Sequence, residues 1–380
     1  MSRAHIALFL PKLSRYGGAE NFAWRLSRAL GEHHDVDFIC ARQETDAPAG
    51  VRVVTVGRPH GPKALKMLWF AMRAEAIRRS GTYDLTIGLG KTLCQDILRI
   101  GGGPTLAFWN HSAAAYSPGP ARAFKQLRRS ISLSHGLGRL IERRQMACSG
   151  TLVANSHFVR DCVCSTFPKL DREKFEIIYN RPDLAAFTPG TSGQRSNARE
   201  RFDLPQDKTV ILTAGTNFVL KGVPHLIRAL DLLPESHILA VAGGRNPQKM
   251  EQLAKSLGIG HRVRFLGRVD DMVSFYRAGD LFALLTFYDA CSNAVLEAAA
   301  CGLPVLSTRA NGSSFFLPES RVIHDPWDSA DVAEMIRTAL ADGLPSTRSD
   351  LAKVESGLEP YLRLVDTLLN TKTNISDTPV

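Results

Sequence analysis

The sequence contains no run of about 18 consecutive apolar residues, the length that a membrane-spanning helix requires. Its N-terminus, MSRAHIALFLPKLSRYGGAE, lacks the longer apolar region and the cleavage site of a signal peptide. This stretch is instead typical of a strand followed by a glycine-containing turn. No short-period repeat and no low-complexity tract is present. We therefore expect a cytoplasmic, globular protein.

Cysteine is sparse and irregularly placed, at positions 40, 94, 148, 162, 164, 291 and 301. Cys162-Val-Cys164 has neither zinc-site nor redox spacing, and disulfides are rare in the cytosol, so reduced thiols are expected. Asp35-Val-Asp37 stands at the start of a strand-like run, which is a poor position for a metal-binding loop. No paired carboxylates of the hydrolase type stand out. The sequence thus predicts neither a metal nor a cofactor.

The length of 380 residues, with 44% hydrophobic and 22% charged residues, predicts two domains, because single cores stop growing near roughly 250–300 residues. The net charge of +10 is unevenly distributed. Residues 1–180 hold 26 Lys and Arg against 14 Asp and Glu, a net of +12, whereas residues 181–380 hold 21 against 23, a net of −2. All of the excess positive charge therefore lies in the first half.

Residues 121–145 concentrate this charge, with seven basic residues and one acid interleaved with apolar residues. The pattern suits docking on an anionic membrane surface, with a solvated helix face as the alternative. Peripheral binding to the inner face of the cytoplasmic membrane is the corresponding expectation. The basic residues are Arg122, Lys125, Arg128, Arg129, Arg139, Arg143 and Arg144.

Short apolar runs alternate with amphipathic stretches twice along the chain. In the first half, helical patterns near 19–30, 63–79, 122–145 and 156–166 lie between strand-like runs. These runs are IALFL, VDFICA, VRVVTV, LTIGLG and TLVAN. The alternation predicts a doubly wound, parallel-sheet α/β domain over residues 1–180.

The pattern stops after Tyr179 and then restarts. Residues 181–205 are rich in Pro, Gly, Ser and Asn, which indicates an interdomain linker. A second doubly wound domain is predicted over 206–350, and residues 351–380 should form a helix that packs back on the N-terminal domain, with a loose tail. The second domain's predicted strands are VILTAG, HILAVAG, VRFLG, LFALLT, PVLST and RVIHD, and its helices lie near 222–233, 247–257, 270–279, 293–301 and 329–342.

In each predicted domain, a glycine-containing loop follows the first strand. Open α/β sheets bind ligands at such loops. Gly17 and Gly18 precede a helix and would let the backbone approach an anion, or simply form a tight turn. Lys221 and Gly222 precede another helix, where an ammonium group and a helix N-terminus could meet a phosphate. The alternative for Lys221 is a solvated side chain.

A third loop places Asp289 before a helix start and Glu297 inside that helix. The spacing suits a ligand that carries both hydroxyl groups and negative charge, because the first N–H groups of a helix lack partners and favour anions. The alternative is an exposed acid followed by an ordinary helix cap at Ser292.

The three loops together resemble motifs of the family 4 retaining glycosyltransferases, which have the GT-B fold of two Rossmann-like domains facing across a cleft. Residues 215–222 resemble the family's Gly-x5-Lys-Gly loop. Residues 289–297 resemble its acid-x7-Glu signature, followed by Ala-x3-Gly-x-Pro-Val. IIYNRPDLAAFTP is similar to the interdomain segment and VANSHFVRD to the last N-domain strand and helix. Within the family, the sequence most resembles the lipopolysaccharide core glucosyltransferases.

The resemblance implies roles for these residues. Lys221 would bind the donor diphosphate, Asp289 would hold the transferred sugar, and Glu297 would accept hydrogen bonds from the ribose. His111 would touch the sugar from the N-terminal domain, or else be a structural histidine. The remaining donor-binding residues would be Gly17, Gly18, Gly215, Thr216, Arg268 and Val269, with the backbone N–H groups of Ala290, Cys291, Ser292 and Asn293.

The sequence departs from the family at two places. The family commonly has Glu where Asp289 stands, which leaves the donor sugar open. Many members have Arg after the first glycine of the Lys-Gly loop, where this chain has Thr216, and related core enzymes have Arg where this chain has Leu220. One diphosphate contact is therefore missing, and Arg245 and Arg309 are candidate replacements.

The implied reaction is transfer of a hexose from a nucleotide diphosphate sugar, most simply a UDP-sugar, to a glycolipid or lipopolysaccharide core hydroxyl with retention of configuration. No metal and no side-chain nucleophile would be required. Nucleic acid is not an expected partner, because the basic segment has few aromatics for stacking. The alternatives are a soluble sugar acceptor, a UDP-sugar epimerase of the same fold, and a two-domain binding protein, for which an export signal would be expected.

Overall fold

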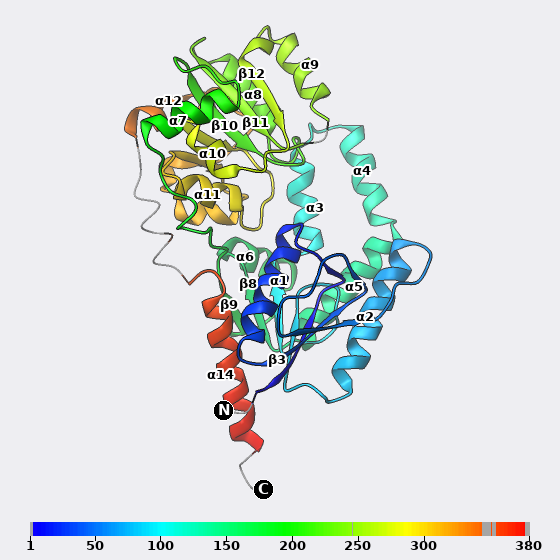
Figure 1. The fold of residues 1–380 in the computed structure, drawn as a ribbon. Helices are drawn as coiled ribbons and strands as arrows, with labels where there is room; N and C mark the ends of the chain where they lie inside the picture. The colour runs from blue at the N-terminus through cyan, green and yellow to red at the C-terminus, as the bar shows by residue number, and fades with distance from the viewer. Residues whose placement is uncertain (1–2, 245, 344–350, 352–354, 377–380) are drawn as a thin grey trace. The chain divides into compact units, whose positions relative to one another are not determined.

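The computed structural model describes residues 3–244, 246–343, 351 and 355–376 (Figure 1). The chain divides into two compact units, each built around its own parallel sheet. The first comprises Met1–Trp109, Pro118–Tyr179 and Glu355–Val380, and the second comprises Asn110–Ser117 and Asn180–Val354. The prediction of two doubly wound, parallel-sheet α/β domains is confirmed.

The first unit has seven parallel strands in the order β5-β3-β1-β6-β7-β8-β9. The order reverses between β1 and β6, which makes that edge the switch point of the sheet. The strands are β1 His5–Phe9, β3 Asp35–Cys40, β5 Val51–Thr55, β6 Leu85–Gly88, β7 Ile97–Ile100, β8 Thr151–Ala154 and β9 Phe175–Ile177, and β2 Lys12–Leu13 pairs separately with β4 Arg42–Gln43. The helices are α1 Gly18–Gly31, α2 Lys63–Arg79, α4 Pro120–Ser130, α5 Leu133–Cys148, α6 His157–Thr166 and α14 Glu359–Ser376, together with α3 Thr105–Ala114, whose residues from Asn110 onward belong to the second unit.

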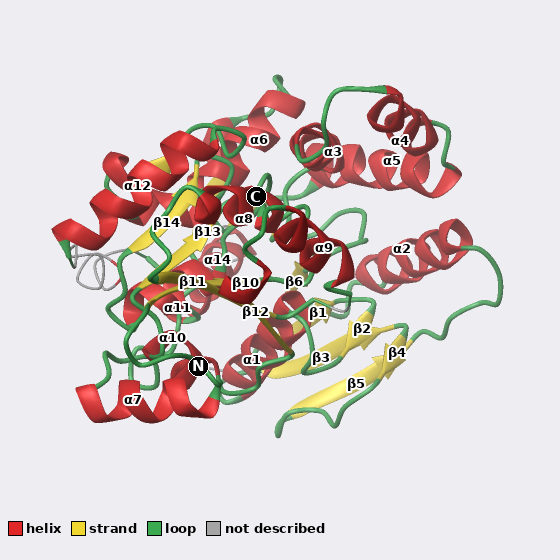
Figure 2. Ribbon diagram, turned by 90° about the horizontal axis from the view of Figure 1, so that it is seen from above, coloured by secondary structure: helices red, strands yellow, loops and turns green. Residues whose placement is uncertain are grey.

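Helices cover both faces of this sheet, because successive side chains of a strand point to opposite sides. Ile6 and Leu8 of β1 pack in one buried cluster with α1 and α14, whereas Ala7 and Phe9 pack in another with α2. Burial on both faces is the normal state of a parallel sheet and explains why its strands are continuous apolar runs. Figure 2 shows α1 and α2 beside strands β1 to β5.

The second unit has six parallel strands in the order β12-β11-β10-β13-β14-β15. Its switch point lies between β10 and β13. The strands are β10 Thr209–Ala214, β11 His237–Ala242, β12 Val263–Gly267, β13 Leu281–Leu284, β14 Val305–Thr308 and β15 Val322–Ile323. The helices are α7 Ser192–Arg201, α8 Val223–Asp231, α9 Gln248–Ser256, α10 Met272–Arg277, α11 Asn293–Ala300 and α12 Ser329–Asp342.

Helix α14, near the C-terminal end of the chain, packs against the N-terminal elements of the first unit (red in Figure 1). Tyr361 and Val365 are buried in the same cluster as β1 and α1. The hydroxyl of Tyr361 accepts a hydrogen bond from the guanidinium of Arg99, a buried charge in β7. No helix in the described parts of the chain is both long and apolar enough to span a bilayer.

The first unit differs from the sequence prediction in three places. The single helical pattern at 122–145 is two helices, α4 and α5, separated at Ile131 and Ser132, where Ser132 has an extended backbone at the N-cap position of α5. Strand β7 and helix α3 were not predicted. In ILRI the strand pattern is broken by Arg99, and the α3 sequence TLAFWNHSAA has no helical periodicity of apolar residues.

The segment 181–205, which was predicted as a linker, contains helix α7. Its sequence SGQRSNARER has no apolar stripe, and a polar anchor holds it instead. Arg199 is 1% exposed and donates to the carbonyls of Ala278, Pro205, Gln206 and Lys208 and to Asp280. A buried guanidinium cannot be recognised from composition, which is why no helix was predicted in this segment.

The expectation of reduced thiols is corrected for one pair. Cys94 and Cys148 form a disulfide across 54 positions of sequence. Both cysteines directly precede neighbouring strands, since β7 pairs with β8, so the fold brings together residues that looked unrelated in the sequence. The other five cysteines, all buried, carry thiols.

We predict that Arg199→Ala lowers the free energy of unfolding by about 3 kcal/mol or more, because several buried acceptors lose a charged donor. The matched control is Arg201→Ala in the same helix, which removes an exposed ion pair to Asp271 and should cost less than about 1 kcal/mol. Urea denaturation of the two variants measures both values. Equal effects would contradict the role assigned to Arg199.

Candidate active site

The loop from Gly215 to Gly222 connects β10 to α8, and each of these two positions requires glycine for a different structural reason. A Cβ on Gly215 would lie 2.6 Å from Cγ of Lys221, so the missing side chain makes room for the lysine stem. Gly222 has φ +71°, and a Cβ there would lie 2.0 Å from the carbonyl oxygen of Leu285. The loop is thereby pressed against the segment that follows β13.

Lys221 and Asp289 form an ion pair, and their side chains are only 19% and 17% exposed. They come from the two loops that follow β10 and β13, the strands at the switch point. The backbone of Asp289 is fixed by a bond from its N–H to the Ala310 carbonyl at 2.8 Å and by one from the Gly312 N–H to its own carbonyl at 2.9 Å. The structure thus brings together the residue predicted to bind the diphosphate and the residue predicted to bind the sugar.

Asn311, which was not among the residues predicted for the site, organises this loop. Its side chain is buried, and its Oδ1 accepts from the N–H groups of Ser292 at 3.3 Å and Ser313 at 3.1 Å. Its Nδ2 donates to Ser307 Oγ at 2.9 Å. The Asn-Gly pair that follows β14 after two intervening residues was the available sequence signal, but such a pair indicates a simple turn equally well.

Helix α11 begins at Asn293 and has eight residues, with Ser292 at its N-cap position. The Ser292 side chain forms no capping bond, and its N–H is already engaged by Asn311. This corrects the prediction that all N–H groups from Ala290 to Asn293 face a ligand, because that of Ser292 points into the protein. Asn293 Oδ1 accepts from Asn180 Nδ2 at 2.9 Å.

Glu297 lies in α11 with a partner that the sequence did not reveal. The hydroxyl of the buried Tyr276 donates to Glu297 Oε2 at 2.9 Å. Burial raises the pKa of the Glu297 carboxyl, and the hydrogen bond from Tyr276 lowers it by less. Burial also raises the pKa of Tyr276 well above its ordinary value, so the phenol stays a donor. Glu297 is therefore a buried hydrogen-bond acceptor that Tyr276 keeps in position, rather than an acid exposed to solvent.

The other predicted donor-site residues of the second unit lie at its surface. Thr216 is exposed. Arg268, at the end of β12, is 78% exposed and pairs with Asp270, and Val269 follows it half-buried. Arg309 pairs with Glu319 at 2.8 Å. Arg245 lies outside the described residues.

His111 lies in the part of α3 that belongs to the second unit. Its ring centroid is 5.6 Å from that of Tyr288, the residue directly before Asp289. Burial lowers the pKa of His111, so its imidazole is neutral near pH 7. The structure therefore places this histidine next to the acidic loop, as a polar group that carries no charge of its own.

Gly17 and Gly18 belong to the first unit, at the start of α1. Gly17 has φ +103°, and a Cβ on it would lie 2.4 Å from Glu20 Oε2, whereas a Cβ on Gly18 would meet nothing within 4 Å. The backbone at Gly18 is thus open to close approach. Among the described residues, no group of three His, Cys, Asp or Glu side chains is placed to hold a metal.

Comparison with known proteins identifies the fold and the family. The crystal structure of WaaG, a glycosyltransferase involved in lipopolysaccharide biosynthesis, matches with a TM-score of 0.71 over 92% of this chain and 93% of that chain at 22% identity. The model for glycosyl transferases group 1 matches residues 194–354, and that for glycosyltransferase family 4 matches residues 16–185. The chain belongs to the GT-B glycosyltransferases. It resembles the lipopolysaccharide core enzymes among them.

Sequence relatives support the same assignment. A probable transglycosylase of Burkholderia thailandensis is 28% identical over 93% of this chain and 90% of its own length. A lipopolysaccharide core biosynthesis glycosyltransferase of Rhizobium meliloti, LpsE, is 30% identical over 50% of this chain, and that match spans 56% of the relative. Anabaena HepE in complex with UDP shares the fold, with a TM-score of 0.69 over 96% of this chain and 99% of that chain at 17% identity.

We predict that Asn311→Ala in this glycosyltransferase lowers the free energy of unfolding by about 2–3 kcal/mol, because buried N–H groups lose their acceptor. Asn311→Asp keeps the acceptor oxygens and should recover most of the loss. Asn197→Ala, at an exposed position of α7, is the matched control and should be nearly neutral. Urea denaturation measures all three, and a neutral Asn311→Ala would show that the loop does not depend on this residue.

Proposed function

We propose that the enzyme transfers a hexose from a UDP-sugar, with UDP-glucose as the first donor to test, to a hydroxyl of a glycolipid or lipopolysaccharide core acceptor. The observation that carries the donor half is the Lys221–Asp289 pair at the switch point of the second sheet. A diphosphate needs a cation and a hexose needs hydrogen-bond acceptors, and this pair offers one of each. The UDP complex of HepE, which shares the fold, supports the choice of base.

The proposed chemistry retains the anomeric configuration by attack of the acceptor on the face that the diphosphate leaves. Lys221 stabilises the charge that develops on the leaving diphosphate, which is where a fixed cation contributes most to the rate. The departing phosphate oxygen accepts the acceptor's proton, so no side-chain nucleophile and no metal takes part. Asp289 and the neutral His111 hold the sugar, and Glu297 binds the ribose hydroxyls.

The acceptor half of the proposal rests on the surface of α4 and α5. Several large apolar side chains are exposed there among the basic residues, which suits an anionic membrane interface better than a solvated face. They are Phe124 at 67%, Leu127 at 58%, Ile131 at 72%, Leu133 at 85% and Leu140 at 61% exposed. LpsE and WaaG, both named for lipopolysaccharide synthesis, support an acceptor of this class. We place the reaction at the inner face of the cytoplasmic membrane.

We predict that two acid-to-amide variants differ in their affinity for UDP. Glu297→Gln should weaken UDP binding at least tenfold, because hydrogen bonds to a charged group contribute about 1.5–3 kcal/mol. Asp289→Asn should leave UDP affinity unchanged or improve it, since Lys221 loses its competing carboxylate, while turnover with UDP-glucose falls. Calorimetric titration with UDP and a steady-state transfer assay measure these effects. Normal UDP binding by Glu297→Gln would exclude its proposed ribose contact.

We predict that the protein co-sediments with vesicles that contain anionic lipid, but not with neutral vesicles, and that salt releases it. The triple variant Arg122→Gln, Arg128→Gln, Arg144→Gln should bind about a hundredfold more weakly, since each cation near such a surface contributes about 1 kcal/mol. UDP binding should persist. The matched control exchanges Arg25, Arg28 and Lys63 of α1 and α2 for Gln and should bind vesicles nearly as well. A wild-type protein that stays in solution at low salt would favour a soluble acceptor.

A further inference from the structure

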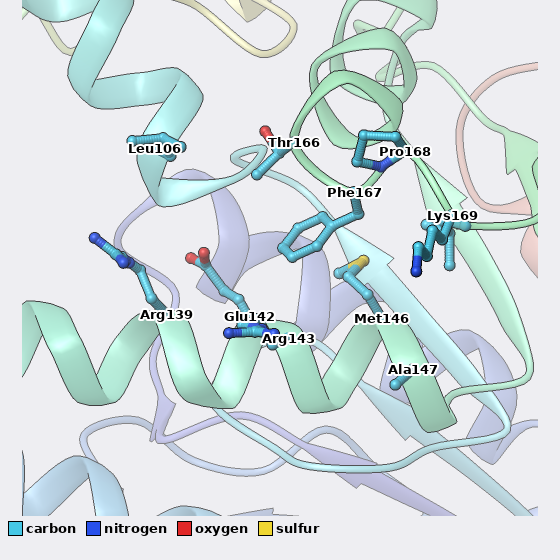
Figure 3. Close-up of a pocket in the computed structure, with 11 residues that line it drawn as sticks. Leu106, Arg139, Glu142, Arg143, Met146, Ala147, Thr166, Phe167, Pro168 and Lys169 are labelled. Atoms are coloured by element: carbon cyan, nitrogen blue, oxygen red, sulfur yellow. The ribbon is translucent and has the colours of Figure 1, made fainter.

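A pocket of about 730 Å³ lies in the first unit, between α5 and the segment that follows α6. Figure 3 shows residues of α5 along one side, Thr166 to Lys169 along another, and Leu106 of α3 at one end. All of its lining residues belong to the first unit. A volume of this size accommodates a drug-sized ligand.

The interior of the pocket is mainly apolar. Met146 of α5 and Phe167 point toward each other in Figure 3, with Pro168 beside them. Leu106 and Leu170 also line the space. Apolar surface of this kind gains most from a ligand segment that has no hydrogen-bonding groups, such as an alkyl chain.

Three cations lie around this apolar space, namely Arg139, Arg143 and Lys169. None of them forms an ion pair with the described residues. The one acid in the lining, Glu142, is engaged elsewhere, because its carboxylate accepts from the N–H of Thr105 at 3.2 Å and from its hydroxyl. With three cations against this one acid, the pocket combines an apolar interior with a net positive charge.

A second cavity, of about 200 Å³, adjoins the first, since both are lined by Glu142, Met146 and Phe167. It lies at the carboxyl ends of β6 and β7 and includes residues 101–103 and Lys91, whose φ is +59°. The carboxyl ends of parallel strands are where α/β sheets bind ligands, and backbone strain gathers at such sites. A ligand in the larger pocket can thus extend toward the sheet edge.

We propose that the larger pocket binds the alkyl chain of an anionic amphiphile, with the phosphate of that molecule held by Arg139, Arg143 and Lys169. This inference deepens the proposed function and rests on it, because it makes the lipid part of the acceptor a ligand of the protein itself. The smaller cavity then receives the polar end of the acceptor. A membrane surface alone would not require an apolar pocket of this kind.

The experiment titrates the intact protein, without vesicles, with hexyl, octyl and decyl phosphate below their critical micelle concentrations. Affinity should rise about fourfold for each added CH2 group that enters the pocket. Inorganic phosphate and octyl maltoside, titrated separately, test charge and chain alone, and both should bind at least tenfold more weakly than octyl phosphate. Calorimetry gives each dissociation constant.

Variants then separate the two parts of the site. Ala147→Trp, at an exposed pocket position on α5, fills the space and should abolish the dependence on chain length, whereas Ala76→Trp on α2 is the matched control. Replacing Arg139, Arg143 and Lys169 together by Gln should weaken all alkyl phosphates at least tenfold and keep that dependence. The triple exchange of Arg25, Arg28 and Lys63 should change neither.

Equal affinity for hexyl and decyl phosphate in the wild-type protein would overturn the proposal, whatever the variants do. So would binding of inorganic phosphate as tight as that of decyl phosphate, which would indicate a simple anion site. UDP is titrated into the same samples. If UDP binds and the alkyl phosphates do not, the pocket assignment fails and the donor half of the proposed function stands. If the alkyl phosphates bind and UDP does not, the failure lies in the donor half of the proposed function.

Discussion

The parallel pairing of β10 with β13 is the constraint on which the candidate site depends. Ile211 lies opposite Leu281 and Leu212 opposite Phe282, so both strands end at the same edge of the sheet. Their loops then bring Lys221 into contact with Asp289 across 68 positions of sequence. A shift of the register by one residue would turn the strand side chains to the opposite faces and separate the pair.

Close packing at two glycines and the buried side chain of Asn311 give these loops their shape. Gly222 is packed against the carbonyl of Leu285, and Gly215 leaves the space that the stem of Lys221 fills. On the other side, Asn311 ties the start of α11 to β14 through Ser292 and Ser307. The ammonium and the carboxylate are thus held before any ligand arrives, and a ligand that uses them meets groups whose freedom is already reduced.

The sequence was sufficient for those parts of the structure that depend on local pattern. The helix predicted near 63–79 has those bounds, and the apolar runs of both halves became strands, because burial on both faces leaves a continuous apolar signal. The motif residues Lys221 and Asp289 were found because glycine and acid spacing is local as well. The sequence did not reveal the features that depend on polar partners far away in the chain. Helix α7 is held by Arg199, and Glu297 is held by Tyr276, and neither contact leaves a periodic trace in the sequence.

The Lys221–Asp289 pair also bears on how the proposed donor would be recognised. With no ligand present, each charge compensates the other in a place where both side chains are mostly removed from water. A diphosphate that took Lys221 for itself would leave Asp289 without its partner, and an unpaired, partly buried carboxylate is unfavourable. A sugar hydroxyl offered to Asp289 by the same ligand restores the lost hydrogen bond. The pair therefore favours a molecule that carries a hexose next to its diphosphate over a nucleotide that carries the diphosphate alone. The preference comes from the cost of leaving Asp289 without a partner when no hexose is bound, rather than from an additional contact.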